Sequence, residues 1–382
     1  MRLRAKGLTR KVVMAELKKA LEQDSKYSDG KILCSMCTRP HPIARIANRL
    51  FLESNLGDPG LFLGSLRLER EAIKKLANLL NGDYSVGFLV SGGTEANLMA
   101  LLAARNTKNI SNPEVVLPES AHFSFTKICG LLGLTPVYAS LDGSYRVDGA
   151  AVEKCLTSKT VAMVGTAGTA ELGAVDPIDR LSEIAVRNDI YLHVDAALGG
   201  LIIPFLEPSD RSGLTFDFQL EGVKSVTVDP HKMGMTTLPA GGILFRNNTY
   251  LDCIKTETPY LTEKHQCTIV GTRTGAAAAA TWAVFESLGC EGLQNITRQC
   301  IRLARLLATK LEAFGYGLVV QPTLNIVAFR SSNSSLLHKK LLQRGWFVSY
   351  VPRLDCVRIV IMPHTKKNHI HAFLRDLRDV DR

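Results

Sequence analysis

The sequence lacks the features that would mark a membrane, secreted or zinc-binding protein. No apolar run approaches the roughly 18 residues of a membrane span, and the apolar cluster Val12 to Ala15 is too short for a signal-peptide core. The nine cysteines are an odd number and are scattered, which is typical of a reducing compartment. We therefore expect a cytoplasmic protein without a membrane anchor.

Two further absences concern metals and nucleotides. Cys34 and Cys37 form the only close cysteine pair, and no second pair at zinc spacing follows. We expect two half-buried thiols in a loop here rather than a metal or redox site. The sequence also contains neither Gly-x-Gly-x-x-Gly nor the Gly-Lys-Ser/Thr of a nucleoside-triphosphate loop.

The net charge of +10 has no obvious target. Lysines and arginines are spread along the chain and do not form a stripe with interleaved aromatics, as nucleic-acid binding would favour. We attribute the charge to solubility and to some attraction for anionic ligands. A nucleic-acid partner is not expected.

The chain of 382 residues is long enough for two domains. Helical patterns cover 9–23 and 65–80, with an irregular segment at 27–64 between them. Short β-branched runs then alternate with helical segments, which indicates a mainly parallel sheet covered on both faces. The return between 226 and 245 is expected to run antiparallel. We predict an N-terminal segment 1–58, a large domain 59–285 and a smaller α+β domain 286–382.

The stretch Ser91-Gly-Gly-Thr-Glu-Ala-Asn97 follows a predicted strand and opens a helix. Its glycines let the backbone approach a ligand closely, and the first helical turn offers free N–H groups and a favourable dipole to an anion. Thr94 adds a hydroxyl. Taken alone, the stretch fits plain packing as well as phosphate binding.

His193-Val-Asp-Ala-Ala197 places an acid at the end of a buried strand, where open α/β sheets bind ligands. A buried carboxylate needs a partner, so Asp195 must pair with a cation, cap a helix or take part in function. In Asp229-Pro-His-Lys232 a lysine ends another apolar run. It is either a surface charge beside a turn or a buried amine, whose pKa burial would lower and whose nucleophilicity burial would raise.

One ligand satisfies all three sites. Pyridoxal 5′-phosphate carries an aldehyde for Lys232, a basic ring nitrogen for Asp195 and a phosphate for the glycine turn. This combination makes the cofactor the leading hypothesis.

These motifs, together with Pro118-Glu-Ser-Ala-His-Phe-Ser124, resemble the fold-type I pyridoxal-phosphate enzymes of the group II amino-acid decarboxylase family. The resemblance covers about 57–363. Within that family, Leu33-Cys-Ser-Met-Cys37, Asn55-Leu-Gly-Asp-Pro-Gly-Leu-Phe62 and Leu324-Asn-Ile-Val327 are most similar to the archaeal L-tyrosine/L-aspartate decarboxylases. The implied fold is a large domain with a mainly parallel sheet plus a smaller C-terminal α+β domain.

The resemblance implies roles for individual residues. Lys232 matches the Schiff-base lysine, Asp195 the partner of the ring nitrogen and His122 the histidine that stacks on the ring. The remaining cofactor contacts implied are Gly93, Thr94, Asn97, Thr169, Ala197 and His231. Gly271 and Thr272 match a segment that reaches the neighbouring subunit's phosphate, which implies a homodimer with shared active sites.

Three of these assignments have bland alternatives, and one feature departs from the family. The structural alternatives are a turn residue for Thr169 and a core histidine for His231. Arg358 matches an arginine that binds the substrate carboxylate, and its structural alternative is an ion pair. Animal relatives carry a proton-donating tyrosine on a long loop that is short here. Tyr260 is the candidate donor and His265 the alternative.

The implied activity is removal of the α-carboxylate from an L-amino acid. The substrates implied are aspartate, which yields β-alanine for coenzyme A, and tyrosine, which yields tyramine for methanofuran. The alternatives are a carbon–carbon lyase resembling sphingosine-phosphate lyase and a catalytically silent protein on the same fold.

Overall fold

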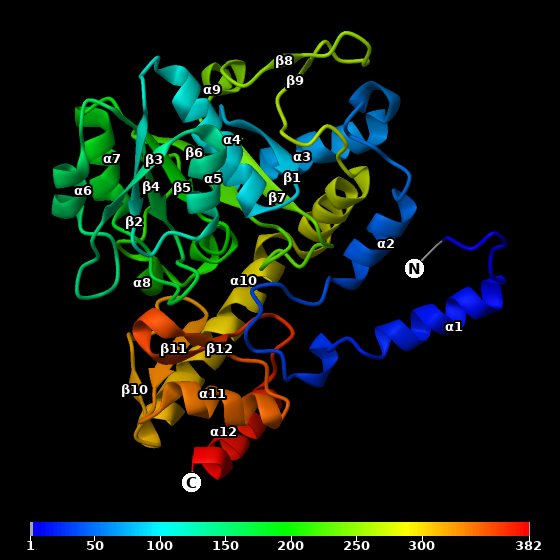
Figure 1. Cartoon of the computed structure of the whole chain (residues 1–382), viewed down its shortest axis with the longest axis vertical. Helices are drawn as coiled ribbons and strands as arrows, with labels where there is room; N and C mark the ends of the chain where they lie inside the picture. Colours follow the sequence, from blue (N-terminus) through cyan, green and yellow to red (C-terminus); the bar gives the residue numbers. More distant parts are fainter. Residues whose placement is uncertain (1–2, 382) are drawn as a thin grey trace.

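A seven-stranded sheet forms the larger lobe of the computed structural model, which describes residues 3–381 (Figure 1). The strand order is β1-β7-β6-β5-β4-β2-β3. Its strands are β1 (Val86–Val90), β2 (Glu114–Pro118), β3 (Thr135–Ala139), β4 (Thr160–Thr166), β5 (Tyr191–Asp195), β6 (Val223–Val228) and β7 (Gly241–Phe245). Only β7 runs antiparallel to its neighbours, and the other pairings are parallel. The predicted mainly parallel sheet with an antiparallel return is confirmed.

Helices cover both faces of this sheet. They are α3 (Leu63–Leu79), α4 (Gly93–Thr107), α5 (Ser124–Leu132), α6 (Gly149–Cys155) and α7 (Ile178–Arg187). In β5, Leu192 and Val194 pack in one cluster with residues of α3 and α7, whereas Tyr191 packs in another with residues of α4 and α5. Alternate side chains of a strand point to opposite faces, so a strand buried on both faces reads as a continuous apolar run.

A four-stranded antiparallel sheet forms the smaller lobe, in the order β10-β11-β13-β12. Its elements are β10 (Gly317–Leu318), β11 (Ile326–Arg330), α11 (Ser334–Gln343), β12 (Ser349–Val351), η5 (Pro352–Leu354), β13 (Cys356–Val360) and α12 (Lys367–Asp381). The long helix α10 (Gly275–Ala313) joins the two lobes (Figure 1). The sequence predicts two helices here, at Gly275 to Trp282 and at Leu293 to Phe314, and the structure has two helical parts of α10 on either side of the non-helical backbone at Gly289.

The N-terminal segment contains a helix that the sequence analysis missed. It comprises α1 (Arg10–Leu21), η1 (Tyr27–Asp29), α2 (Pro42–Leu50) and η2 (Pro59–Leu61). The predicted helix α1 exists, with Thr9 as N-cap, but none of its residues is buried and it extends away from the body (Figure 1). The missed helix α2 lies in the segment predicted as irregular. Its start signals are a proline in the first turn and the His41 side chain, which accepts a hydrogen bond from the Ile43 amide.

Short elements complete the larger lobe: η3 (Gly199–Leu201), η4 (Ile203–Phe205), α8 (Pro208–Arg211), α9 (Asn248–Asp252), β8 (Thr256–Glu257) and β9 (His265–Gln266). The edge strand β3 and helix α6 were also missed by the sequence analysis. The predicted domain boundaries after residues 58 and 285 remain predictions, and α10 runs continuously across the second.

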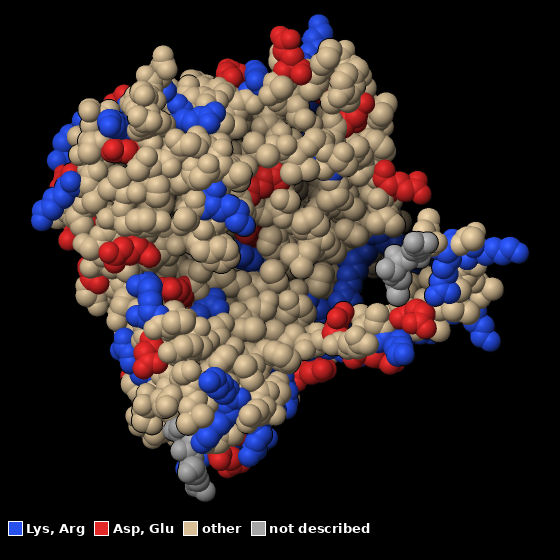
Figure 2. Space-filling model, viewed as in Figure 1, with Lys and Arg blue, Asp and Glu red and all other residues tan. Residues whose placement is uncertain are grey.

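Charges of both signs are interspersed over the face in Figure 2. Within residues 3–381, no helix has the combined length and apolar character that crossing a membrane requires. The same part of the chain contains no cluster of His, Cys, Asp and Glu arranged to hold a metal ion.

Candidate active site

The carboxyl ends of the parallel strands bring the predicted residues together. Asp195 is the last residue of β5 and pairs in register with Thr166 at the end of β4 and with Thr227 in β6. The turn after β1 and the Asp229–Lys232 turn after β6 open at the same edge. This is where α/β sheets bind ligands.

A cavity of about 310 Å³ opens at this edge. It is lined by eight of the predicted residues, namely Gly93, Thr94, Asn97, His122, Asp195, Ala197, His231 and Lys232. Its other walls come from Met36, Ser91, Gly92, Glu95, Thr166, Gly168, Ala170, Leu198 and Asp229. Residues more than a hundred positions apart in the sequence therefore face one small space.

The Lys232 amine points into this cavity and pairs with a carboxylate that the sequence analysis did not assign. Its Nζ lies 3.1 Å from Asp229 Oδ2, and the Lys232 side chain is 18% exposed. Burial lowers the pKa of the amine, but the charges of Asp229 and Asp195 outweigh it, so the net shift is upward. The expected lowering of the Lys232 pKa is therefore wrong, because the expectation counted burial and not the neighbouring acids.

Asp195 is held by two hydrogen bonds. Its Oδ2 accepts from the side-chain amide of Asn97 at 2.9 Å, and its Oδ1 accepts from the backbone N–H of Ala197 at 3.1 Å. The two hydrogen bonds fix its orientation at the cavity wall. Among residues 3–381 no arginine forms an ion pair with Asp195, and its place in the wall of the Lys232 cavity favours a functional role.

Two histidines on the cavity wall are neutral. The pKa of His122 is lowered, mainly by burial, and its Nδ1 accepts a hydrogen bond from the Ser124 amide, which leaves the proton on Nε2. The pKa of His231 is also lowered by burial, and its Nδ1 accepts from the Ala240 amide at 3.2 Å. Neutral rings suit contact with a flat aromatic ligand.

The glycine turn is shaped for close approach. Helix α4 begins at Gly93 without a side-chain cap, so its first-turn N–H groups face the cavity end. A Cβ at Gly93 would lie 3.0 Å from Asp229 Oδ2 and 3.3 Å from the Ala197 Cβ. A side chain at this position would therefore require its neighbours to shift.

Comparison with known proteins identifies the family. Residues 65–332 match the model of the pyridoxal-dependent decarboxylase conserved domain. The chain belongs to this family. A probable L-tyrosine/L-aspartate decarboxylase of Methanothermobacter thermautotrophicus is 51% identical over 93% of this chain and 98% of that protein. The L-aspartate decarboxylase of Thermococcus kodakarensis is 47% identical over 98% of both chains.

Solved structures show the same fold. A sphingosine-1-phosphate lyase of Burkholderia pseudomallei superposes with a TM-score of 0.92 at 28% identity, covering 100% of this chain and 92% of that one. The glutamate decarboxylase of Lactobacillus brevis superposes with a TM-score of 0.90 at 22% identity, covering 100% and 94%. The predicted pyridoxal-phosphate fold is confirmed, and the decarboxylase family is favoured over the lyase alternative because the family model and the more identical relatives agree on it.

The decarboxylase uses pyridoxal 5′-phosphate, and the residues present fit that cofactor. A lysine amine, a carboxylate, a neutral imidazole and a glycine turn face the same cavity. In addition, Asp229 Oδ1 and Thr166 Oγ1 are buried without a hydrogen-bond partner among the described residues. Such atoms in a cavity wall are typical of a site that completes its hydrogen bonds with a ligand.

Five predicted residues do not line this cavity. The Thr169 hydroxyl accepts a hydrogen bond from the Ala174 amide at 3.0 Å, so Thr169 behaves as a turn residue, which was its structural alternative. The hydroxyl facing the cavity from that segment belongs to Thr166 instead.

Tyr260 is 87% exposed on the β8–β9 hairpin. Gly271 and Thr272 are exposed too, and Thr272 lines a separate cavity that also contacts Ser91 and Glu95.

Arg358, the fifth, is buried behind the cavity in β13. Its Nη1 donates to the Cys34 carbonyl at 3.1 Å and to Ser349 Oγ at 3.3 Å, while its Nε has no partner among the described residues. Burial lowers the pKa of the guanidinium to about 10. Among the described residues, no carboxylate forms an ion pair with Arg358, and its hydrogen bonds go to Cys34 and Ser349 instead.

The Cys34–Cys37 segment proves to belong to the site. Met36 lines the cavity, and the Cys37 thiol is close enough to Lys232 for the two charges to influence each other. The pKa of both thiols is raised, chiefly by burial, so they are less reactive than ordinary cysteines. The expectation of two half-buried thiols in a loop is confirmed. No spacing of residues in the sequence would have placed these thiols beside the lysine.

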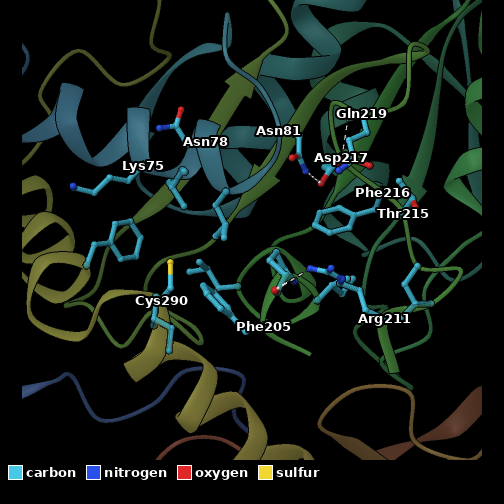
Figure 3. A pocket seen from close by; sticks show the side chains of 18 of the residues that line it. Lys75, Asn78, Asn81, Phe205, Arg211, Thr215, Phe216, Asp217, Gln219 and Cys290 are labelled. Atoms are coloured by element: carbon cyan, nitrogen blue, oxygen red, sulfur yellow. Dashed lines mark hydrogen bonds between the residues drawn. The ribbon is translucent and has the colours of Figure 1, made fainter. Parts of the chain in front are cut away.

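A larger cavity of about 780 Å³ lies elsewhere, between α3, η4 and α10 (Figure 3). Its polar wall contains Asp217, which accepts from the Asn81 side chain at 2.8 Å and from the Gln219 amide at 3.1 Å. Aromatic side chains of Phe205 and Phe216 face it from the other elements. None of the predicted site residues lines it, so volume alone would have pointed to the wrong place.

Proposed function

We propose that this decarboxylase acts on L-aspartate, forming β-alanine, on L-tyrosine, forming tyramine, or on both. The observation that carries the activity is the meeting of Lys232, Asp195 and His122 in one cavity. The substrates are supported by the names of relatives at 44–51% identity. β-Alanine would serve coenzyme A synthesis, and tyramine would serve methanofuran synthesis.

The chain's own residues divide the work in this proposal. When bound, pyridoxal 5′-phosphate supplies the electron sink for the electrons released with CO₂. Lys232 would hold the cofactor covalently, and Asp195 would pair with its ring nitrogen. His122 and Ala197 would contact the ring, while Gly93, Thr94 and His231 would hold the phosphate end.

Arg358 and Tyr260 have weaker structural support. Arg358 is separated from the cavity by the Cys34–Cys37 segment, so binding a substrate carboxylate there requires that segment to shift. Arg358→Lys would then raise KM more than it lowers kcat. Tyr260 lies on an exposed hairpin, and as proton donor it would serve the cavity of a partner subunit.

A homodimer with shared active sites is part of the proposal. Helix α1 exposes Val12, Val13, Met14, Leu17 and Leu21, and an apolar face of this kind marks an interaction surface. The exposed segment at Gly271 and Thr272 borders a cavity that reaches the glycine turn from behind. Mixing inactive Lys232→Ala and Thr272→Arg proteins should restore activity if two chains build one site, and mixing that restores nothing would exclude sharing.

Substrate and cofactor are tested together. The Lys232→Ala protein should lose the visible absorbance of the covalently held cofactor and nearly all turnover. CO₂ release should then be measured from aspartate, glutamate and tyrosine with the unchanged protein. Release from none of the three, or an aldehyde product, would exclude the proposal, and the aldehyde would indicate a carbon–carbon lyase.

We place the protein in the cytoplasm. All nine cysteines are unpaired in the structure, which suits a reducing compartment. Fractionation of native cells with an antibody to the chain tests this placement.

A further inference from the structure

A chain of buried polar side chains runs through the sheet behind Asp195. Ser225 Oγ lies 2.8 Å from His193 Nδ1, and His193 Nε2 lies 2.9 Å from the side-chain oxygen of Asn97. The Asn97 amide nitrogen then reaches Asp195 Oδ2 at 2.9 Å. Thr227 donates to the same Asn97 oxygen at 2.7 Å. All these side chains are buried, from 0% exposed at His193 to 7% at Asp195.

The direction of each hydrogen bond follows from His193. Complete burial lowers the pKa of this histidine to about 4, so the ring is neutral and carries one N–H. The Asn97 oxygen can only accept, so the N–H must be on Nε2. Nδ1 is therefore the acceptor, and the Ser225 hydroxyl donates to it.

The Asp195 carboxylate independently fixes the Asn97 amide. A carboxylate oxygen can only accept, so the amide must turn its NH₂ group toward Asp195 and its oxygen toward His193 Nε2 and Thr227 Oγ1. The flipped amide would place its oxygen against a carboxylate oxygen, which is repulsive. Asp195 therefore receives a defined donor on Oδ2, besides the Ala197 N–H on Oδ1.

The placement of this chain argues against a purely packing role. Buried polar groups cost free energy unless every partner is satisfied, and an apolar residue at 97 would suit the surroundings of α4, which are rich in alanine and leucine. The chain ends on the cavity carboxylate and not at the protein surface. The position of Asn97 in the sequence predicts a contact near the phosphate-binding turn, but its side chain contacts Asp195.

We propose that His193 and Asn97 are positioning residues that act through Asp195 on the ring nitrogen of pyridoxal phosphate. His193 sets the orientation of the Asn97 amide, and that amide holds the Asp195 carboxylate in the position where it keeps the ring nitrogen protonated. The inference rests on the assignment of Asp195 in the proposed function.

The test uses the nearly isosteric variant Asn97→Leu in the full-length protein. It fills the same space but removes the donor to Asp195 and the acceptor for His193 and Thr227. Loss of one hydrogen bond to a charged group corresponds to roughly a tenfold rise in the cofactor Kd. The ¹⁵N signal of ring-labelled pyridoxal phosphate, bound to the protein, should move toward the unprotonated position, and kcat should fall with KM little changed.

Two further variants separate positioning from folding. His193→Gln retains an N–H donor near the Nε2 position and should keep the cofactor Kd and the ¹⁵N signal, whereas His193→Phe should shift both. Ser182→Ala removes a buried hydrogen bond to the Gly222 amide, far from the site, and should change only the Tm.

Each result has one meaning. If the unchanged protein fails to bind pyridoxal phosphate covalently, the proposed function itself is lost. If it binds, but Asn97→Leu and His193→Phe leave the ¹⁵N signal and the Kd unchanged, the positioning role is excluded. A shift in both variants that His193→Gln does not share supports it.

Discussion

Replacing Asp229 with asparagine is expected to make the Lys232 amine reactive at lower pH. In the cofactor-free protein the Asp229 carboxylate lies 3.1 Å from Nζ and helps to hold the amine in its charged form. The change removes the charge of Asp229, the largest of the effects that oppose burial. Burial then dominates, and the pKa of Lys232 should fall.

The size of the expected fall in the Lys232 pKa follows from the distance between the Lys232 and Asp229 charges. Two unit charges 3.1 Å apart interact with about 5 kcal/mol at an effective dielectric constant of about 20. At about 1.4 kcal/mol for each pKa unit, this sets an upper limit near 4 units. Asparagine retains a dipole and Asp195 retains its charge, so we expect a fall of about 1 to 3 units.

The assay is the rate of covalent capture measured by stopped-flow absorbance across pH. Only the neutral amine reacts, so below its pKa the rate should rise about tenfold for each unit by which the pKa falls. Pyridoxal without the phosphate is the control ligand, because Asp229 lies beside the glycine turn and its charge would also repel a phosphate. If the pH midpoint for pyridoxal capture is the same in both proteins, the account of Lys232 is refuted.

Three further predictions concern the glycine turn, the buried histidine and the long helix. Gly93→Ala adds a Cβ 3.0 Å from Asp229 Oδ2 and should weaken cofactor binding, measured by equilibrium dialysis, since overpacking costs about 1–3 kcal/mol. The control Gly130→Ala meets open space and should leave cofactor binding unchanged. His193 has a folded pKa of about 4 against an ordinary 6.5, so its contribution to stability is complete above pH 6.5 and is lost as the pH falls toward 4, by about 3 kcal/mol. Urea unfolding of His193→Gln should lack that part of the pH dependence, and equal slopes in both proteins would contradict the assignment. Gly289→Ala forces a side chain into a conformation with φ 57° and ψ −168° and should lower the unfolding free energy by about 1–3 kcal/mol, unlike Gly64→Ala, which has open space around it.

The sheet was predictable because its strands are buried on both faces. The run Val86–Val90 contains no polar side chain, and Tyr191–Asp195 is buried at every position although it includes His193, so the positions of both could be read within a residue or so. The edge strand β3 escaped because it contains Pro136 and is only partly buried, so it has neither the apolar run nor the alternation of an inner strand.

The sequence predicts those site residues that belong to a motif at the end of a strand. It does not predict contacts made by residues outside such a motif. Asp195 ends a strand, and Lys232 and His122 each follow one, so topology brings them to one edge. The sign of the Lys232 pKa shift depends on whether Asp229 turns toward the amine, which sequence spacing does not reveal. Thr169 and Thr166 belong to one short segment, and only the backbone turn decides which hydroxyl faces the cavity.

Helix α10 connects the two lobes through a single glycine. Its first part packs on α2 and α3 and its last part on β10 and β11, and the non-helical backbone of Gly289 lies between the two parts. An α-helix turns by about 100° for each residue, so a residue inserted in either part would rotate the apolar face of that part away from the lobe it packs on. The relative orientation of the two lobes therefore depends on the backbone of one residue that does not line the cavity of Lys232.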